Sequence, residues 1–271
     1  EEIRGHTMSV KIGMIHYNFA GTIDDFFKYC SETGYEYVEL QAGSVSGDNP
    51  EQAVEELRKK VDYWNLKVNA FAVGNDFVVS DPETVKAQID RTEQIAGLAG
   101  ILGAKTLRME GGSPKDSVPE TKWVEAMTNC LRRCVDQFAE RDQVKLAVDN
   151  HGVVTNDGDL MLELIEEVNS PWVGSCLDTM NYRWFGHDLG TVGRYYEMLA
   201  PYVLHMHLKD GRGSRGNYQG EALGEGEIDL QKAVDCLKSV GYDGVWTCEY
   251  EGRENDGTGQ TRSYNWMISH L

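Results

Sequence analysis

Two histidines separated by a single residue form the part of this sequence best suited to chemistry. The segment Val-Leu-His-Met-His-Leu-Lys-Asp places His205, His207 and Lys209 at alternate positions. Successive side chains of a β-strand point to opposite faces, so these three polar groups would share one face. Met206 and Leu208 would occupy the other. This pattern predicts a strand that lies between a polar site and an apolar layer.

A second predicted strand has the same two-faced character and brings carboxylates. In Gly-Val-Trp-Thr-Cys-Glu-Tyr-Glu-Gly, the parity puts Thr247, Glu249 and Glu251 on one face. Trp246 and Cys248 fall on the opposite face. The two strands together predict barrel strands that open into one site.

Four residues of the predicted strand ends make a coherent divalent-metal site. They are Asp149, Asp178, His207 and Glu249. Three carboxylates and one imidazole suit Mn²⁺, which we expect, and also fit Mg²⁺, Co²⁺ or Zn²⁺. The alternative is that each residue caps or bridges locally. His205 lies one strand step deeper, and we group it with the substrate-binding residues, as a hydrogen-bonding histidine rather than a ligand.

The elements that would position these residues alternate regularly along the chain. Helical patterns end on Gly34, Gly103 and Gly241, and each is followed by a short strand. Strands are predicted near 11–16, 36–41, 67–73, 105–109, 145–149, 173–177, 203–208 and 244–249. Helices are predicted near 22–33, 50–64, 82–102, 121–141, 158–168, 189–199, 229–240 and 261–270.

Eight strands, each followed by a helix, predict a single-domain (β/α)₈ TIM barrel, for which about 250 residues is the usual length. The alternative is a doubly wound open sheet. Against it, the first strand leads into Ile-His-Tyr-Asn-Phe and not into a glycine-rich phosphate loop. We assign residues 9–271 to the barrel and residues 1–8 to an N-terminal arm or a cloning remnant.

The composition excludes several classes of partner. The 271 residues are 41% hydrophobic and carry 26 basic and 44 acidic side chains, a formal net charge of −18. Such a surface repels nucleic acids and anionic membranes. No apolar run approaches the roughly 20 residues of a membrane span. We therefore expect a cytoplasmic protein, and we interpret its six cysteines as structural thiols.

In a TIM barrel, chemistry gathers at the carboxyl ends of the strands. Six of the eight predicted strands end there in ionisable groups. In chain order, the polar residues at these ends are Glu39 and Gln41, Arg108 and Glu110, Asp149 and His151, Asp178, His207 and Lys209, and Glu249 and Glu251. Because burying unpaired charge is costly, this concentration predicts a functional site and not a stabilising one.

Five motifs in order carry a family resemblance. They are Ala-Val-Asp-Asn-His-Gly, Cys-Leu-Asp-Thr-Met-Asn, His-Met-His-Leu-Lys-Asp, Leu-Gly-Glu-Gly-Glu-Ile-Asp and Cys-Glu-Tyr-Glu-Gly. The chain from Val10 to Gly252 resembles the xylose-isomerase-like sugar phosphate isomerase/epimerase superfamily. Carried over by position, the family's metal ligands fall on the same four residues.

The resemblance implies chemistry beside a carbonyl. A metal chelates two substrate oxygens, a base removes the neighbouring proton, and a metal-bound enediolate forms, with Asp149 and Glu249 as the pair that would move the proton. Three positions depart from the family pattern. Asp149 stands where glutamate is usual, Asn181 where ketose epimerases tend to have histidine, and Gly213 where they tend to have arginine.

Further candidates follow from the residues beside these positions. His151 and Lys209 are candidates for proton transfer, since histidine titrates near neutral pH and a lysine beside a metal can have a lowered pKa. The alternatives are a loop histidine bonded to backbone and a lysine salt-bridged to a carboxylate. Glu110 and Arg212 are candidates for binding substrate. Arg212 belongs to the glycine-rich loop 211–220, which is either a lid or a solvated flexible loop.

We expect a metal-dependent isomerase or epimerase acting on a small sugar or polyol. The alternative is a metal-dependent lyase or dehydratase on the same scaffold, either an inosose dehydratase or the metal-binding subunit of a C-glycoside-cleaving enzyme acting on 3-keto-glycosides. A DNA-repair endonuclease or a non-catalytic barrel is the third reading. The net charge of −18 disfavours the endonuclease. The partner would be the small-molecule substrate, and the protein could assemble as a homodimer or homotetramer.

Overall fold

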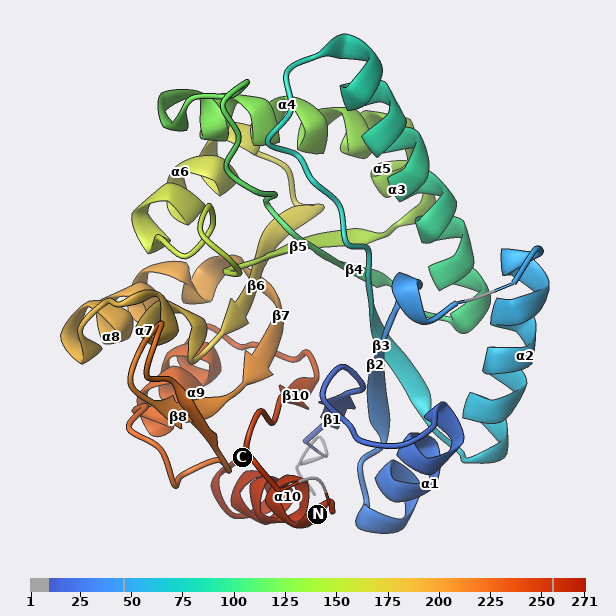
Figure 1. Cartoon of the computed structure of the whole chain (residues 1–271), viewed down its shortest axis with the longest axis vertical. Coiled ribbons are helices and arrows are strands. Elements are labelled where there is room, and N and C mark those ends of the chain that lie inside the picture. Colours follow the sequence, from blue (N-terminus) through green and yellow to red (C-terminus); the bar gives the residue numbers. More distant parts are fainter. Residues whose placement is uncertain (1–9, 46, 255) are drawn as a thin grey trace, which may run out of the picture.

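Eight parallel strands close into a barrel with the helices outside it, as the sequence predicted. The computed structural model describes residues 10–45, 47–254 and 256–271, so the arm assigned to residues 1–8 lies outside the described residues. The strands follow one another around the ring in the order β1-β10-β7-β6-β5-β4-β3-β2 (Figure 1). They are β1 (Ile12–Ile15), β2 (Tyr37–Gln41), β3 (Lys67–Ala72), β4 (Thr106–Met109), β5 (Lys145–Asp149), β6 (Val173–Asp178), β7 (Val203–Leu208) and β10 (Trp246–Cys248).

The helices begin and end where local capping chemistry dictates. Thr22 and Asp25 form a reciprocal capping box at the start of α1, while Asp81 caps α3 ahead of a proline. Gly34 and Gly103 end α1 and α3 in the left-handed conformation that glycine tolerates best. The outer helices are α1 (Ile23–Thr33), α2 (Pro50–Tyr63), α3 (Pro82–Leu102), α4 (Trp123–Cys134), α6 (Gly158–Val168), α8 (Leu189–Leu199), α9 (Leu230–Ser239) and α10 (Thr258–His270).

Two helical segments differ from the sequence prediction. The helix predicted over 121–141 is α4, a π-helical turn over Val135–Ala139 and the short α5 (Glu140–Asp142). The short helix α7 (Asn181–Phe185) follows β6 and was not predicted, because five residues carry too little periodicity to be recognised.

The glycine-rich loop predicted at 211–220 is mostly an ordered hairpin. Strands β8 (Asp210–Arg212) and β9 (Gln219–Glu221) pair antiparallel. The Asp210 carboxylate holds the base of the hairpin by accepting hydrogen bonds from the backbone amides of residues 211, 224, 226 and 228. These four charge-assisted bonds tie the start of β8 to the segment that follows the hairpin.

The apolar core lies between the barrel strands and the helices. Phe26, Phe71, Leu102 and Leu107 are among its fully buried side chains. All six cysteines are free thiols and five of them are buried, which agrees with the structural role predicted for them. No helix in the described part of the chain is long and apolar enough to cross a membrane.

Candidate metal centre

Three of the four predicted metal ligands meet at the carboxyl end of the barrel. Asp178 ends β6 and pairs in register with His207 of β7. Glu249 follows β10, and its backbone amide donates to the Leu208 carbonyl of β7 at 2.9 Å. Because neighbouring parallel strands end at the same edge, this register brings one ligand atom of each of the three to within 4.8 Å of the others. The three side chains are buried.

Two of the atoms that face one another in this cluster lack an aligned hydrogen bond. Asp178 Oδ1 accepts from the amides of Met180 and Asn181 at 2.7 and 2.8 Å, but its Oδ2 has no partner. His207 Nδ1 lies 3.1 Å from Glu249 Oε2 and 4.0 Å from Asp178 Oδ2 without an aligned hydrogen bond. Buried polar atoms without partners are costly, and a divalent cation would satisfy both, with Glu249 as a third ligand. The cluster therefore fits a metal ion.

Burial also disfavours the ionised form of the Asp178 carboxylate. It raises the pKa of Asp178 to about 7, although the Lys209 ammonium opposes the shift. The neighbouring Glu249 carboxylate adds to the raised pKa by repulsion. A cation between the two carboxylates would remove this repulsion and keep both ionised.

Glu39 of β2 contacts His207 at Nε2, the ring nitrogen that does not face the other two ligands. Glu39 Oε2 lies 2.7 Å from His207 Nε2 and 2.6 Å from His205 Nε2, and Glu39 Oε1 accepts from Arg108 Nε at 2.8 Å. With Nε2 donating to a carboxylate, the free Nδ1 of His207 is the nitrogen available to a metal. Sequence reasoning placed Glu39 at the barrel mouth but gave it no role. The one indication of a role in the sequence was a glutamate at an inward-facing position of a strand, between two apolar residues.

His205 lies below the cluster and does not line either of the cavities at the barrel mouth. Its imidazole is 3% exposed and contacts Glu39, and burial lowers its pKa. The structure therefore places His205 as a hydrogen-bonding histidine that supports the charge network under the site, away from the cavities where a substrate would bind. His205 precedes His207 by two residues on the same face of β7, so its side chain lies deeper in the barrel.

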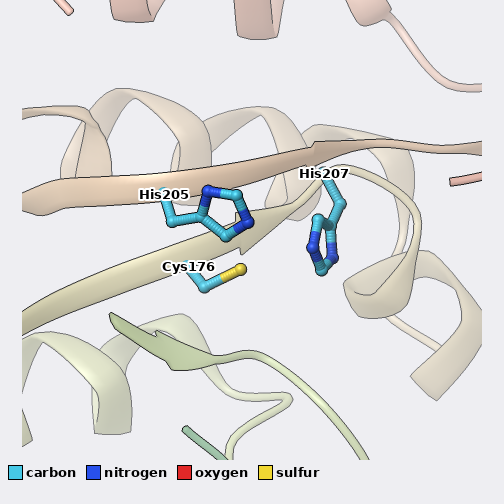
Figure 2. Close-up of side chains that lie close together, drawn as sticks. All are labelled: Cys176, His205 and His207. Carbon is cyan, nitrogen blue, oxygen red and sulfur yellow. The ribbon is translucent and has the colours of Figure 1, made fainter. Parts of the chain in front are cut away.

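Cys176 of β6 lies beside the two histidines on the barrel floor (Figure 2). Sulfur and imidazole can together bind a soft metal ion. Here both Nε2 atoms already contact Glu39, and burial raises the pKa of the Cys176 thiol. We interpret these three side chains as the polar floor of the site.

Asp149 stands apart from the three-ligand cluster. Its Oδ2 accepts from Arg108 Nη1 at 2.8 Å, and its Oδ1 is buried without a partner. Asp149 is one methylene shorter than the glutamate usual at this position, and Arg108 holds it on the β4 side of the barrel. The free Oδ1 still makes it a candidate fourth ligand.

Lys209 is buried among carboxylates beside the cluster. Its Nζ lies 3.0 Å from Glu249 Oε1, 2.9 Å from Glu251 Oε2 and 3.7 Å from Asp178 Oδ2. These carboxylates overcome the opposing effect of burial and raise the pKa of Lys209. The structure therefore shows Lys209 salt-bridged to carboxylates, which the sequence predicted as the alternative to a base, and its ammonium is placed to donate hydrogen bonds.

Two cavities open above the cluster. One, of 250 Å³, is lined by Glu110, Asp149 and Glu249, and the other, of 460 Å³, is lined by Lys209. His151 lines both cavities and so stands between them. The structure thus brings five predicted site residues to one connected mouth.

Arg212 does not reach this mouth. Its side chain donates to the Glu225 carbonyl and lies 3.8 Å from Glu221 Oε1, and it lines neither cavity. Parity within β8 explains the difference, because Arg212 falls on the outer face of the hairpin while the hairpin packs inward through Gly211 and Gly220. The structure thus places Arg212, a predicted substrate-binding residue, away from both cavities.

Residues 27–270 match the family model of the xylose isomerase-like TIM barrel. The chain therefore belongs to that family, in agreement with the resemblance found in its motifs. A segment of 119 residues is also 27% identical to an uncharacterised protein of Methanocaldococcus jannaschii, covering 42% of this chain and 39% of that protein.

Solved structures with different activities share the fold. The IolI protein with a bound zinc atom has a TM-score of 0.79 at 17% identity, over 96% of this chain and 97% of that one. The 3-keto-D-glucoside 4-epimerase YcjR from E. coli has a TM-score of 0.75 at 17% identity, over 96% and 99%. The probable 3-DHS dehydratase AsbF of Bacillus anthracis has a TM-score of 0.72 at 16% identity, over 97% and 99%.

Proposed function

We propose that this protein is a divalent-metal-dependent isomerase or epimerase that removes a proton next to a carbonyl group of a small sugar or polyol. The observation that carries the proposal is the convergence of Asp178, His207 and Glu249 beneath two cavities, with Asp178 Oδ2 and His207 Nδ1 buried and without an aligned hydrogen bond. The zinc atom in the IolI structure and the epimerase activity of YcjR support it.

A divalent ion held by Asp178, His207 and Glu249, with Asp149 as a candidate fourth ligand, would polarise a substrate carbonyl as a Lewis acid. We expect this ion to be Mn²⁺. Arg108 and Glu39 fix Asp149 and His207 from below through the bonds described above, so the ligands are preorganised.

The proton would be moved by residues that line the cavities. Glu249 lines the 250 Å³ cavity, and the Lys209 ammonium and His207 lower its pKa against the effect of burial. It therefore stays ionised and can accept a proton from carbon. His151, reachable from both cavities, is the candidate to return a proton from another side, and the Lys209 ammonium can donate to an oxygen that gains negative charge.

A lyase or dehydratase is the second candidate. The specific feature in its favour is the protonated Lys209, which lies beside Glu249 and could give a proton to a departing hydroxyl. Both candidate reactions begin with removal of the same proton. The dehydratase AsbF, on the same fold, supports keeping this alternative.

The test follows solvent deuterium into substrate. Chelator-stripped protein is reloaded with Mn²⁺ and mixed in D₂O with ketoses, inososes and 3-keto-glycosides, and NMR monitors exchange and products. We expect metal-dependent exchange that Glu249→Gln abolishes and that Glu163→Gln, on the exposed face of α6, leaves unchanged. An isomerised product would identify an isomerase, and an eliminated product a lyase. Tight Mn²⁺ binding without exchange in any compound would refute both.

We expect the protein to act in the cytoplasm on a free small-molecule substrate and to form a homodimer or homotetramer. Sedimentation of the purified chain would test the assembly. A monomer at micromolar concentration would refute it.

A further inference from the structure

The larger cavity has a wall that the proposed chemistry does not use. Trp184, Tyr218 and Tyr250 line it together with Lys209 and Glu251. Its volume of 460 Å³ falls in the range of about 300–1,000 Å³ typical of small-molecule sites. Because Lys209 also contacts Glu249, the cavity adjoins the candidate metal centre.

The aromatic wall is held in place from outside. The Tyr218 ring lies against the backbone of Gly211, where an added Cβ would come within 2.8 Å of it. The Tyr250 ring packs against Gly252 and Gly259 in the same way. The Trp184 carbonyl accepts from the Arg215 amide at 2.8 Å, and the Arg215 guanidinium lies over the Trp184 ring. These side chains therefore form a fixed surface.

The Tyr218 hydroxyl is the unexplained group on this surface. Its oxygen is buried beside the Glu251 carboxylate and makes no aligned hydrogen bond among the residues that the structure describes. Burial raises the pKa of Tyr218, against the Lys209 ammonium and with the Glu251 carboxylate, so the hydroxyl keeps its proton. A buried hydroxyl without a partner is costly unless a ligand satisfies it.

The charges around the cavity select against anions. Lys209 is the one lysine or arginine among the residues that line it, and its ammonium is already surrounded by Asp178, Glu249 and Glu251. Glu254 adds another carboxylate to the lining. Within this lining a phosphate group would meet Glu251 and Glu254 with the already paired Lys209 as the one lysine or arginine to balance it, whereas a neutral hydroxyl would find a donor and an acceptor.

We propose that this cavity binds a neutral, polyhydroxylated part of the substrate and that Tyr218 and Glu251 recognise one of its hydroxyl groups. Tyr218 donates a hydrogen bond to that oxygen, and Glu251 accepts its hydrogen. Trp184 and Tyr250 pack against the carbon skeleton. The inference rests on the proposed function, because it places the reacting carbonyl of the same substrate over the neighbouring cluster. It makes the substrate an unphosphorylated sugar or glycoside.

The test compares neutral and phosphorylated ligands in matched variants. Calorimetry measures binding of D-fructose, an inosose and a 3-keto-glucoside to the Mn²⁺-loaded protein, with D-fructose 6-phosphate as the anionic counterpart. We expect at least one neutral compound to bind more tightly than the phosphate ester. Tyr218→Phe should weaken that binding about tenfold, the effect of losing one buried hydrogen bond to a ligand. Tyr63→Phe, at a tyrosine 79% exposed on α2, should have no effect.

Two further measurements separate the possible failures. Mn²⁺ affinity should be unchanged in Tyr218→Phe, because Tyr218 is not a member of the cluster. The thermal unfolding midpoint should equal or exceed that of wild type, because the substitution removes a buried hydroxyl that makes no aligned hydrogen bond. Tighter binding of the phosphate ester, equal affinity in Tyr218→Phe, or no binding of any neutral compound would each overturn the inference. Binding that depends on Tyr218 without deuterium exchange would refute the proposed function alone, while exchange that is indifferent to Tyr218 would refute this inference alone.

Discussion

Replacing Glu39 by glutamine tests whether a carboxylate outside the metal cluster orients its histidine. In the structure Glu39 Oε2 lies 2.7 Å from His207 Nε2, which leaves Nδ1 facing Asp178 and Glu249. A glutamine amide at this place can turn either its oxygen or its NH₂ group toward the ring, and the second choice favours the wrong tautomer. Replacing such a partner of a metal-binding histidine costs about 10- to 100-fold in metal affinity, or roughly 1.4 to 2.7 kcal/mol.

The same substitution has a cost in stability that the structure also predicts. Glu39 Oε1 accepts from Arg108 Nε at 2.8 Å, and both side chains are buried. Removing one partner of a buried ion pair typically costs about 3–5 kcal/mol. We expect the low end of this range because Arg108 keeps its second carboxylate, Asp149.

The assay is a titration of chelator-stripped protein with Mn²⁺, in which electron paramagnetic resonance counts the free ion. Circular dichroism at the titration temperature shows that each variant is folded. His205→Gln is the matched control, because it removes the other histidine on Glu39 and leaves the contact with His207 intact. We expect Mn²⁺ affinity within about threefold of wild type in this control, since the metal-facing nitrogen is untouched. A folded Glu39→Gln protein that binds Mn²⁺ as tightly as wild type would refute the argument.

The remaining predictions concern the ligands, the hairpin and pH. Asp178→Asn should weaken Mn²⁺ binding more than Asp149→Asn in the same titration, because Asp149 lies outside the three-ligand cluster; the opposite order would contradict the geometry. Mn²⁺ at about a hundred times its dissociation constant should raise the free energy of unfolding, measured with urea, by about 2.7 kcal/mol, and a chelator should reverse this gain. An unchanged urea midpoint would exclude a metal site in the native state. Asp210→Asn should lower the free energy of unfolding, measured in urea, by about 1–3 kcal/mol, because four buried or half-buried amides lose a charged acceptor. Asp235→Asn, on the exposed face of α9, should leave this free energy nearly unchanged. His207 and His205 lower the pKa of Glu39 below its ordinary value of 4.5, against the effect of burial. A lowered carboxylate pKa adds stability that is complete above the ordinary value and is lost as the pH falls, so metal-free Glu39→Gln should lose stability less steeply than wild type below about pH 4.5; parallel curves would contradict this.

The fold, and which residues gather at the barrel mouth, could be predicted from the sequence alone. Helix caps such as Thr22 and Asp81, and the glycines that end helices before each strand, depend on contacts a few residues apart and can be read directly. The alternation of polar and apolar residues in β7 then assigned His207 and Lys209 to one face. Local geometry was sufficient for these conclusions because strand parity and helix capping involve only neighbouring residues.

How the charged residues pair across the barrel could not be predicted, because it depends on contacts between distant strands. Glu39 reaches His207 and Arg108 from a strand far away in sequence, and Arg108 holds Asp149 outside the three-ligand cluster. The register between strands sets these contacts, and no pattern within one strand encodes it. The hairpin is a similar case. Its glycines indicated flexibility, yet Asp210 binds the amide of Gly211 and three amides of the segment that follows the hairpin. These amides come together only after the chain has folded, and the same hairpin carries Tyr218 to the cavity.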